Sequence, residues 1–136
     1  MAHRKCILVA DVVAGVTTVR TVLGPEFDIV GVCTLSEARS SLHRDVDLIV
    51  CGIHSDDSRM FDLLRLAKAD PATQEIPFVC FRDMDSHLAP PFLESLQIAC
   101  KALGAVAFID LFDLKARYGT KQADARFSEI LTNALS

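Results

Sequence analysis

A short, wholly apolar segment in the middle of the chain limits the folds that this sequence can adopt. Leu48 to Cys51 are four consecutive apolar residues, and after Gly52 and Ile53 the chain becomes polar at once. An uninterrupted apolar run of this length is typical of a strand covered on both faces, as in a parallel sheet. In open α/β sheets the functional site lies at the carboxyl ends of the strands. Gly52 therefore stands at the mouth of the predicted site, where it contributes no side chain.

Strand-like apolar runs and helical patterns alternate along the rest of the chain. The predicted strands are Lys5–Asp11, Phe27–Thr34, the central run, Ile76–Phe81 and Ala105–Ile109. Apolar residues at helical spacing follow each strand. Five strands that alternate with five helices predict an α/β fold, a doubly wound five-stranded parallel sheet with helices on both faces. The 136 residues are enough for a single domain, residues 1–136.

Local signals mark where several helices begin and end. The segment Thr34–Glu37 has the pattern of a capping box, and Asp57 or Ser58 is suited to begin the following helix. Pro90–Pro91 fits the first turn of a later helix. The segment Tyr118–Thr120 interrupts the apolar pattern just before the last helix.

Composition excludes several classes of function. The formal net charge is -4 and the Lys and Arg residues are scattered along the chain, so we expect no binding to nucleic acid. No segment is long and apolar enough to span a membrane or to act as a secretory signal, so we expect a cytoplasmic protein without membrane contact. Five cysteines without C-x-x-C spacing indicate buried thiols rather than disulfides or a zinc site.

Four segments resemble the CheY-like receiver domain of bacterial response regulators. Their sequences are ILVAD, DLIVCGI, IPFVCF and LGAVAFIDLF, which are similar to the first, third, fourth and fifth strands of that family. The likeness covers nearly the whole chain. It implies a flavodoxin-like three-layer sandwich with strand order 2-1-3-4-5, numbered along the chain, and a site at the carboxyl ends of strands one, three, four and five.

The resemblance also implies that the phosphorylation site is degenerate. Receivers phosphorylate an aspartate that ends strand three, with a divalent cation held by acids after strand one, a hydroxyl residue after strand four and a lysine after strand five. Asp11 keeps the first acidic position, whereas Val12, Gly52, Arg82 and Leu111 replace the second acid, the acceptor, the hydroxyl residue and the lysine. Glycine has no oxygen to phosphorylate, and two ligands of the cation are lost. We therefore expect a pseudo-receiver with no enzymatic activity, no metal and no cofactor.

Arg82 has two interpretations. Its guanidinium could reach into the vacated site and pair with Asp11 or Asp56 in place of the missing cation. Alternatively, Arg82 is exposed to solvent and is balanced by its neighbour Asp83, an arrangement that contributes little to stability.

The alternation of side chains along strands makes a related prediction for two cysteines. If Gly52 and Arg82 both face the site, Cys80 shares the face of Arg82 and Cys51 lies on the face opposite Gly52. We therefore expect Cys51 and Cys80 to point away from each other as inert core thiols.

Three polar residues after the central strand form a candidate rim for the same site. His54, Asp56 and Asp57, together with Asp11, could bind a metal or exchange protons. The start of a helix also favours acidic residues at these positions, through capping and the helix dipole. Oxygen and nitrogen donors without fixed spacing are a weak metal signal, so we favour the capping interpretation.

In receivers, the fourth helix, fifth strand and fifth helix usually form the face that binds a partner or a second copy. Phe92, Leu111, Phe112 and Tyr118 are the candidate contact residues on the corresponding face here. These four residues are equally consistent with core positions or scattered surface apolar groups.

The sequence leaves three functions open. The one we favour is a stand-alone pseudo-receiver in bacterial two-component signal transduction, which acts as a phosphorylation-independent protein–protein interaction module. The second is a phosphoaccepting receiver that uses Asp56 or Asp57, although the second acid and the lysine that support transfer are missing. The third is a small-ligand-binding, flavodoxin-like protein with its pocket above Gly52, which no dinucleotide, P-loop or nucleophile-elbow motif supports.

Overall fold

The computed structural model describes residues 4–56, 59–85 and 88–136, which form a five-stranded parallel sheet with helices on both faces. The strand order is β2-β1-β3-β4-β5, which confirms the predicted doubly wound α/β fold and its topology. The strands are β1 (Cys6–Ala10), β2 (Asp28–Val32), β3 (Leu48–Gly52), β4 (Phe78–Arg82) and β5 (Ala107–Asp110).

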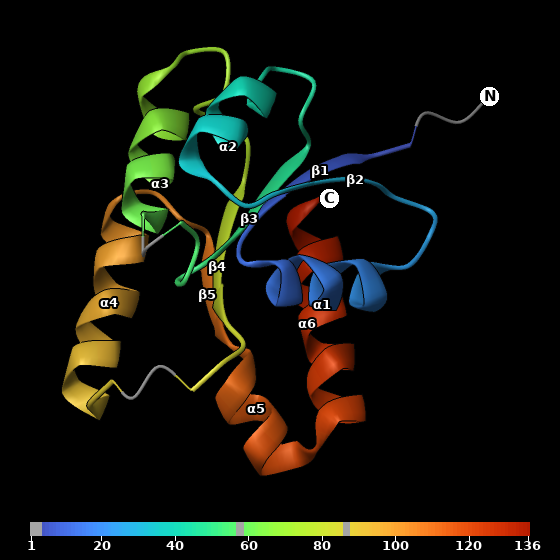
Figure 1. Ribbon diagram of the computed structural model, residues 1–136, viewed down its shortest axis with the longest axis vertical. Helices are drawn as coiled ribbons and strands as arrows, with labels where there is room; N and C mark the ends of the chain where they lie inside the picture. The colour runs from blue at the N-terminus through green and yellow to red at the C-terminus, as the bar shows by residue number, and fades with distance from the viewer. Residues whose placement is uncertain (1–3, 57–58, 86–87) are drawn as a thin grey trace.

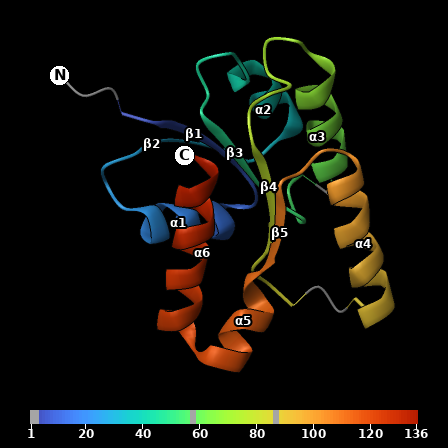
Figure 2. The same ribbon diagram turned by 180° about the vertical axis from the view of Figure 1, so that it is seen from behind.

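Six helices cover the sheet within the described residues. Helices α2, α3 and α4 lie on one face and α1 and α6 on the other, while α5 continues directly from the end of β5 (Figures 1 and 2). The helices are α1 (Val13–Leu23), α2 (Leu35–Ser41), α3 (Met60–Ala69), α4 (Pro90–Ala102), α5 (Leu111–Tyr118) and α6 (Thr120–Ala134). No helix in the described part of the chain is long and apolar enough to cross a membrane.

The alternation of side chains along the strands produces a hydrophobic core on each face of the sheet. Leu8, Ile49 and Phe78 belong to the core beneath α2, α3 and α4. Val50 and Phe81 belong to the core beneath α1 and α6. Strands β3 and β4 are buried along their whole length, which explains why their sequences are continuous apolar runs.

Cys51 and Cys80 lie on the same face of the sheet, so the sequence-based expectation that they point apart is wrong. They are Cα partners in the β3–β4 register and belong to the same core. The expectation failed because Gly52 pairs with Phe81 in this register, and Arg82, one residue further, faces the opposite side. Burial raises the pKa of the Cys51 thiol, which favours the protonated, unreactive form.

The structure differs from the sequence-based prediction after β5, where α5 is an additional helix that the sequence pattern did not predict. The Asp110 carboxylate caps α5 by accepting a hydrogen bond of 3.1 Å from the backbone N–H of Asp113. The helix ends at Gly119, whose φ of 82° lies in the left-handed region. Leu111 is the one residue of α5 that is fully buried, so the helix has too weak an apolar pattern to be predicted. The predicted break at Tyr118–Thr120 is the turn between α5 and α6.

Other local predictions are confirmed. Thr34 and Glu37 form both hydrogen bonds of a capping box at the start of α2. Pro90 and Pro91 occupy the first positions of α4. The proposed caps of α3, Asp57 and Ser58, lie outside the described residues.

Candidate functional site

The side chain of Asp11 fills the space above Gly52. Asp11 follows β1 directly and is only 4% exposed. A Cβ atom on either Gly15 or Gly52 would overlap the Asp11 carboxyl group, so both glycines are needed to accommodate it. The end of β3 therefore faces a carboxyl group from β1 rather than an open pocket. The pocket above Gly52 that the sequence left open for a small ligand is filled.

The Asp11 carboxyl group is in an electrostatically unfavourable environment. Burial raises its pKa from the ordinary 3.8 to about 6, although a hydrogen bond from the backbone N–H of Val12 lowers it in part. The negative charge of Asp83 raises this pKa further. Among the described residues, Asp11 Oδ1 has no hydrogen-bond partner. Asp11 is thus a buried acid that is protonated more readily than an ordinary aspartate.

These residues do not fit the divalent cation site that the receiver fold implies. Val12 offers no side-chain oxygen and forms the N-terminal boundary of α1, while Gly52 has no side chain. Asp11 alone, enclosed between two glycines, supplies too few oxygen ligands for a hard cation. Within the described part of the chain, no group of three His, Cys, Asp or Glu residues could hold a metal.

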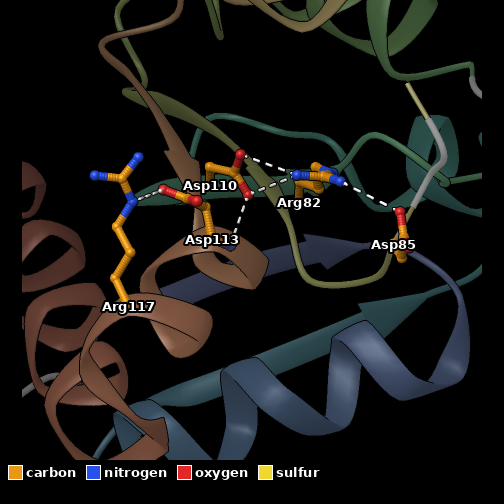
Figure 3. Close-up of polar contacts among 5 residues, drawn as sticks. All are labelled: Arg82, Asp85, Asp110, Asp113 and Arg117. Carbon is orange, nitrogen blue, oxygen red and sulfur yellow. Dashed lines mark hydrogen bonds and ion pairs between the residues drawn. The ribbon is translucent and has the colours of Figure 1, made fainter. Parts of the chain in front are cut away.

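Arg82 pairs with Asp110, so both sequence-based interpretations of this residue are wrong (Figure 3). Asp110 is its Cα partner across β4 and β5, and Arg82 Nη1 donates to both carboxylate oxygens at 3.0 and 3.1 Å. The guanidinium also lies 4.9 Å from the centre of the Phe112 ring and 3.7 Å from Asp85. Arg82 is only 7% exposed. Its side chain lies on the face of the sheet opposite the Asp11 side chain, so the guanidinium points away from that carboxyl group.

The Asp83 carboxylate, which follows β4 and lies on the side opposite Arg82, contacts two residues that the sequence did not indicate. Thr18 Oγ1 of α1 donates to Asp83 Oδ2 at 2.7 Å, and Lys115 Nζ of α5 pairs with Asp83 Oδ1 at 2.9 Å. The alternation beyond β4 indicates which way Asp83 points. The position of Lys115 depends on α5, which the sequence pattern did not predict. A lysine therefore does lie near the site, but it is paired with an aspartate of the chain itself.

Leu111 packs in the core and is 0% exposed. The interpretation of Leu111 as a candidate contact residue is therefore wrong, because it is covered by the core beneath α1 and α6. The other three candidates on this face are accessible: Phe92 is 58% exposed, Phe112 36% and Tyr118 46%.

The candidate rim residues do not gather around Asp11. The Asp56 carboxylate accepts a hydrogen bond of 2.7 Å from the backbone N–H of Leu35 and so links the β3–α3 segment to the start of α2. Asp56 has a φ of 43°, a left-handed conformation that aspartate tolerates better than most residues. His54 lines a separate pocket near α3 and α4. Asp57 lies outside the described residues.

Solved structures of response regulators have a similar fold. The phosphorylated cyanobacterial phytochrome response regulator RcpA superposes with a TM-score of 0.70 at 19% identity, covering 96% of this chain and 95% of that one. The Mn²⁺-bound response regulator Rcp1 has a TM-score of 0.66 at 18% identity, with 95% of each chain covered. The chemotaxis protein CheY4 of Vibrio cholerae has a TM-score of 0.63 at 13% identity, with 96% and 99% covered.

These likenesses show that the chain has the CheY-like, flavodoxin-like fold of receiver domains. No known family model matches the chain, and no curated protein is significantly similar to it in sequence.

Proposed function

We propose that this chain is a pseudo-receiver, a receiver-fold domain of bacterial two-component signalling that binds a protein partner or a second copy without being phosphorylated. The observation that carries the proposal is the Asp11 carboxyl group, which occupies the space above Gly52. Phosphoryl transfer to a receiver requires an acceptor oxygen, a cation and room for the phosphoryl group. At the end of β3 the position of the acceptor is occupied by Gly52, and the Asp11 carboxyl group fills the space that a phosphoryl group would need.

Two ion pairs near the strand ends also favour a domain that stays in one state. Arg82 is paired with Asp110 beside the Phe112 ring, and Lys115 is paired with Asp83. Both cations are therefore already engaged with carboxylates of the chain. The side-chain oxygens of Asp56, the alternative acceptor within the described residues, lie at the start of α2, where one of them accepts the Leu35 N–H. None of these contacts favours transfer of a phosphoryl group to an aspartate outside the end of β3.

The distribution of exposed apolar side chains supports a partner surface over α4, β5 and α5. Seven large apolar side chains are exposed among the described residues, and five of them lie on α4, on α5 or in the connection before β5. These five are Phe92, Ile98, Val106, Phe112 and Tyr118. β5 is an edge strand, so this side of the sheet is not covered by a further strand. Exposed apolar side chains on neighbouring elements are candidates for contact with a partner.

Intact-mass measurement after incubation with acetyl phosphate and Mg²⁺ tests the loss of phosphorylation. We expect no gain of a phosphoryl group, while a receiver that keeps the acceptor aspartate, the second acid and the lysine is modified in a parallel incubation. A stoichiometric gain of one phosphoryl group would overturn the proposal. Peptide mapping of such a product would then identify the acceptor among Asp11, Asp56 and Asp57.

A further inference from the structure

An apolar pocket of about 390 Å³ lies between α3, α4 and the segment that follows β3. Its size falls within the range of small-molecule sites, which are mostly apolar with a few polar groups. Six apolar side chains form its walls: Ile53, Met60, Phe61, Leu88, Phe92 and Leu96. The imidazole of His54 completes the lining.

Helix α4, which contributes Phe92 and Leu96 to the pocket wall, buries few of its residues. Cys100 is the one fully buried residue among the 13 of α4, whereas the ten residues of α3 include four buried ones. Phe92 at the rim is 58% exposed, and Leu96 is partly buried against the core beneath α4. A ligand in the pocket would remove these apolar surfaces from water, which is favourable.

His54 provides the polar group of the pocket. Its Nε2 atom is buried and has no hydrogen-bond partner among the described residues. A buried nitrogen without a partner loses its hydration without compensation. The torsion that orients an imidazole about its Cβ–Cγ bond is broad, so the ring has the freedom to rotate, and a hydrogen bond to a ligand requires a rotation that turns Nε2 toward the pocket.

We propose that this pocket binds a small, neutral, mostly apolar molecule that carries one hydroxyl group, with His54 Nε2 as the hydrogen-bond partner of that hydroxyl. A charged ligand is disfavoured because the apolar walls would strip its hydration. An aromatic ring is suited to the walls because Phe61 and Phe92 both line them. The inference does not rest on the proposed loss of phosphorylation, because Asp11 and Gly15 lie on the other side of the sheet, although Phe92 belongs both to the pocket wall and to the proposed partner surface.

Titration of the full-length, isotope-labelled chain with p-cresol and toluene, followed by NMR, tests the site. The two probes have the same ring and methyl group and differ only in the hydroxyl. We expect p-cresol to shift the resonances of the lining residues saturably, with a dissociation constant roughly threefold to tenfold below that of toluene, as one hydrogen bond predicts. NOEs from the p-cresol ring to Phe92 and Leu96 in the unaltered protein would locate the ligand.

Three variants separate this site from non-specific binding. His54→Leu should raise the p-cresol dissociation constant to that of toluene. Leu96→Phe fills the pocket and should abolish binding of both probes, whereas Ile98→Phe adds similar bulk to the exposed side of the same helix and should leave binding unchanged. The absence of saturable shifts, or of NOEs at the lining residues, would overturn the proposal that the pocket binds a ligand. Equal affinity for the two probes would overturn the role of His54.

Discussion

The Asp11 carboxyl group and the two glycines around it form one packing arrangement. A β-carbon on Gly52 would overlap the carboxyl group, and so would one on Gly15. The position of the Asp11 carboxyl group therefore depends on the absence of a side chain at both Gly15 and Gly52. Asp11 and residue 52 are therefore energetically coupled, and a double-mutant cycle measures the free energy of that coupling.

We expect Gly52→Ala to lower the free energy of unfolding by about 1–3 kcal/mol, because the added methyl group overpacks the site. In an Asp11→Ala background the same substitution should cost at least about 1 kcal/mol less. Urea unfolding of the four proteins measures both values. Gly31→Ala is a matched control, because its added Cβ would meet Val16 instead of Asp11. Equal costs of Gly52→Ala in the two backgrounds would contradict the overlap.

The raised pKa of Asp11 makes a prediction about pH. Since the folded-state pKa is about 6 and the ordinary value is 3.8, the unfolded chain releases this proton first as the pH rises. The contribution of Asp11 to stability is therefore most favourable below about pH 4 and is lost as the pH rises through about 6. Two pKa units correspond to about 2–3 kcal/mol.

Asp11→Asn has no ionisation at this position, so its stability relative to the unaltered protein should rise by about 2–3 kcal/mol between pH 4 and pH 7. Denaturant unfolding of both proteins across this range measures the difference, and the other titrating groups cancel because both proteins contain them. A difference that does not change with pH would mean that Asp11 has an ordinary pKa.

At the scale of helices and strands, signals that act within a few residues predicted the structure best. The apolar runs predicted β3 and β4, the Thr34–Glu37 pattern predicted the start of α2, and Pro90–Pro91 predicted the start of α4. Helix α5 was missed because it is short and has one buried residue. The partner of Arg82 was missed for another reason: it depends on the register of β4 and β5, which residue patterns within one strand do not contain.

Helix α5 holds Phe112 and Lys115 in place, and it begins at Asp110, which both caps the helix and pairs with Arg82. Asp110→Ala removes both interactions, whereas Asp110→Asn removes the charge but keeps a good capping group. We expect the Ala variant to be about 1 kcal/mol less stable than the Asn variant. Amide hydrogen exchange should be faster in the first turn of α5 in the Ala variant alone.

A substitution elsewhere in α5 serves as the control for this comparison. Asp113 and Arg117 form an ion pair at 2.9 Å, but their side chains are 45% and 66% exposed. Asp113→Asn should therefore change stability by less than about 0.5 kcal/mol. If Asp110→Ala and Asp110→Asn were equally stable and equally protected from exchange, the cap would not be what fixes the start of α5.

At the scale of the whole molecule, α4 buries fewer of its side chains than α1, α3 or α6 do. Helices α1 and α6 cover one face with several buried residues each, whereas α4 leaves apolar side chains exposed. An interaction module that does not depend on phosphorylation must present its contact surface permanently. The exposed apolar groups of α4 and of the connection before β5 meet this requirement, and they predict that single substitutions there will weaken partner binding.

We expect Ile98→Lys and Val106→Lys each to weaken self-association or capture of a partner at least tenfold, because a charge at the centre of an apolar interface costs about 2 kcal/mol or more. Ile98 and Val106 are 62% and 57% exposed, so both variants should fold with nearly unchanged stability. Val13→Lys is the matched control, since Val13 is an apolar residue, 70% exposed, on α1. Sedimentation velocity measures self-association, and quantitative comparison of proteins cross-linked to each variant measures partner capture. Equal losses of binding in all three variants would contradict a contact at α4 and β5, because the added charge of Val13→Lys lies on α1, away from that surface.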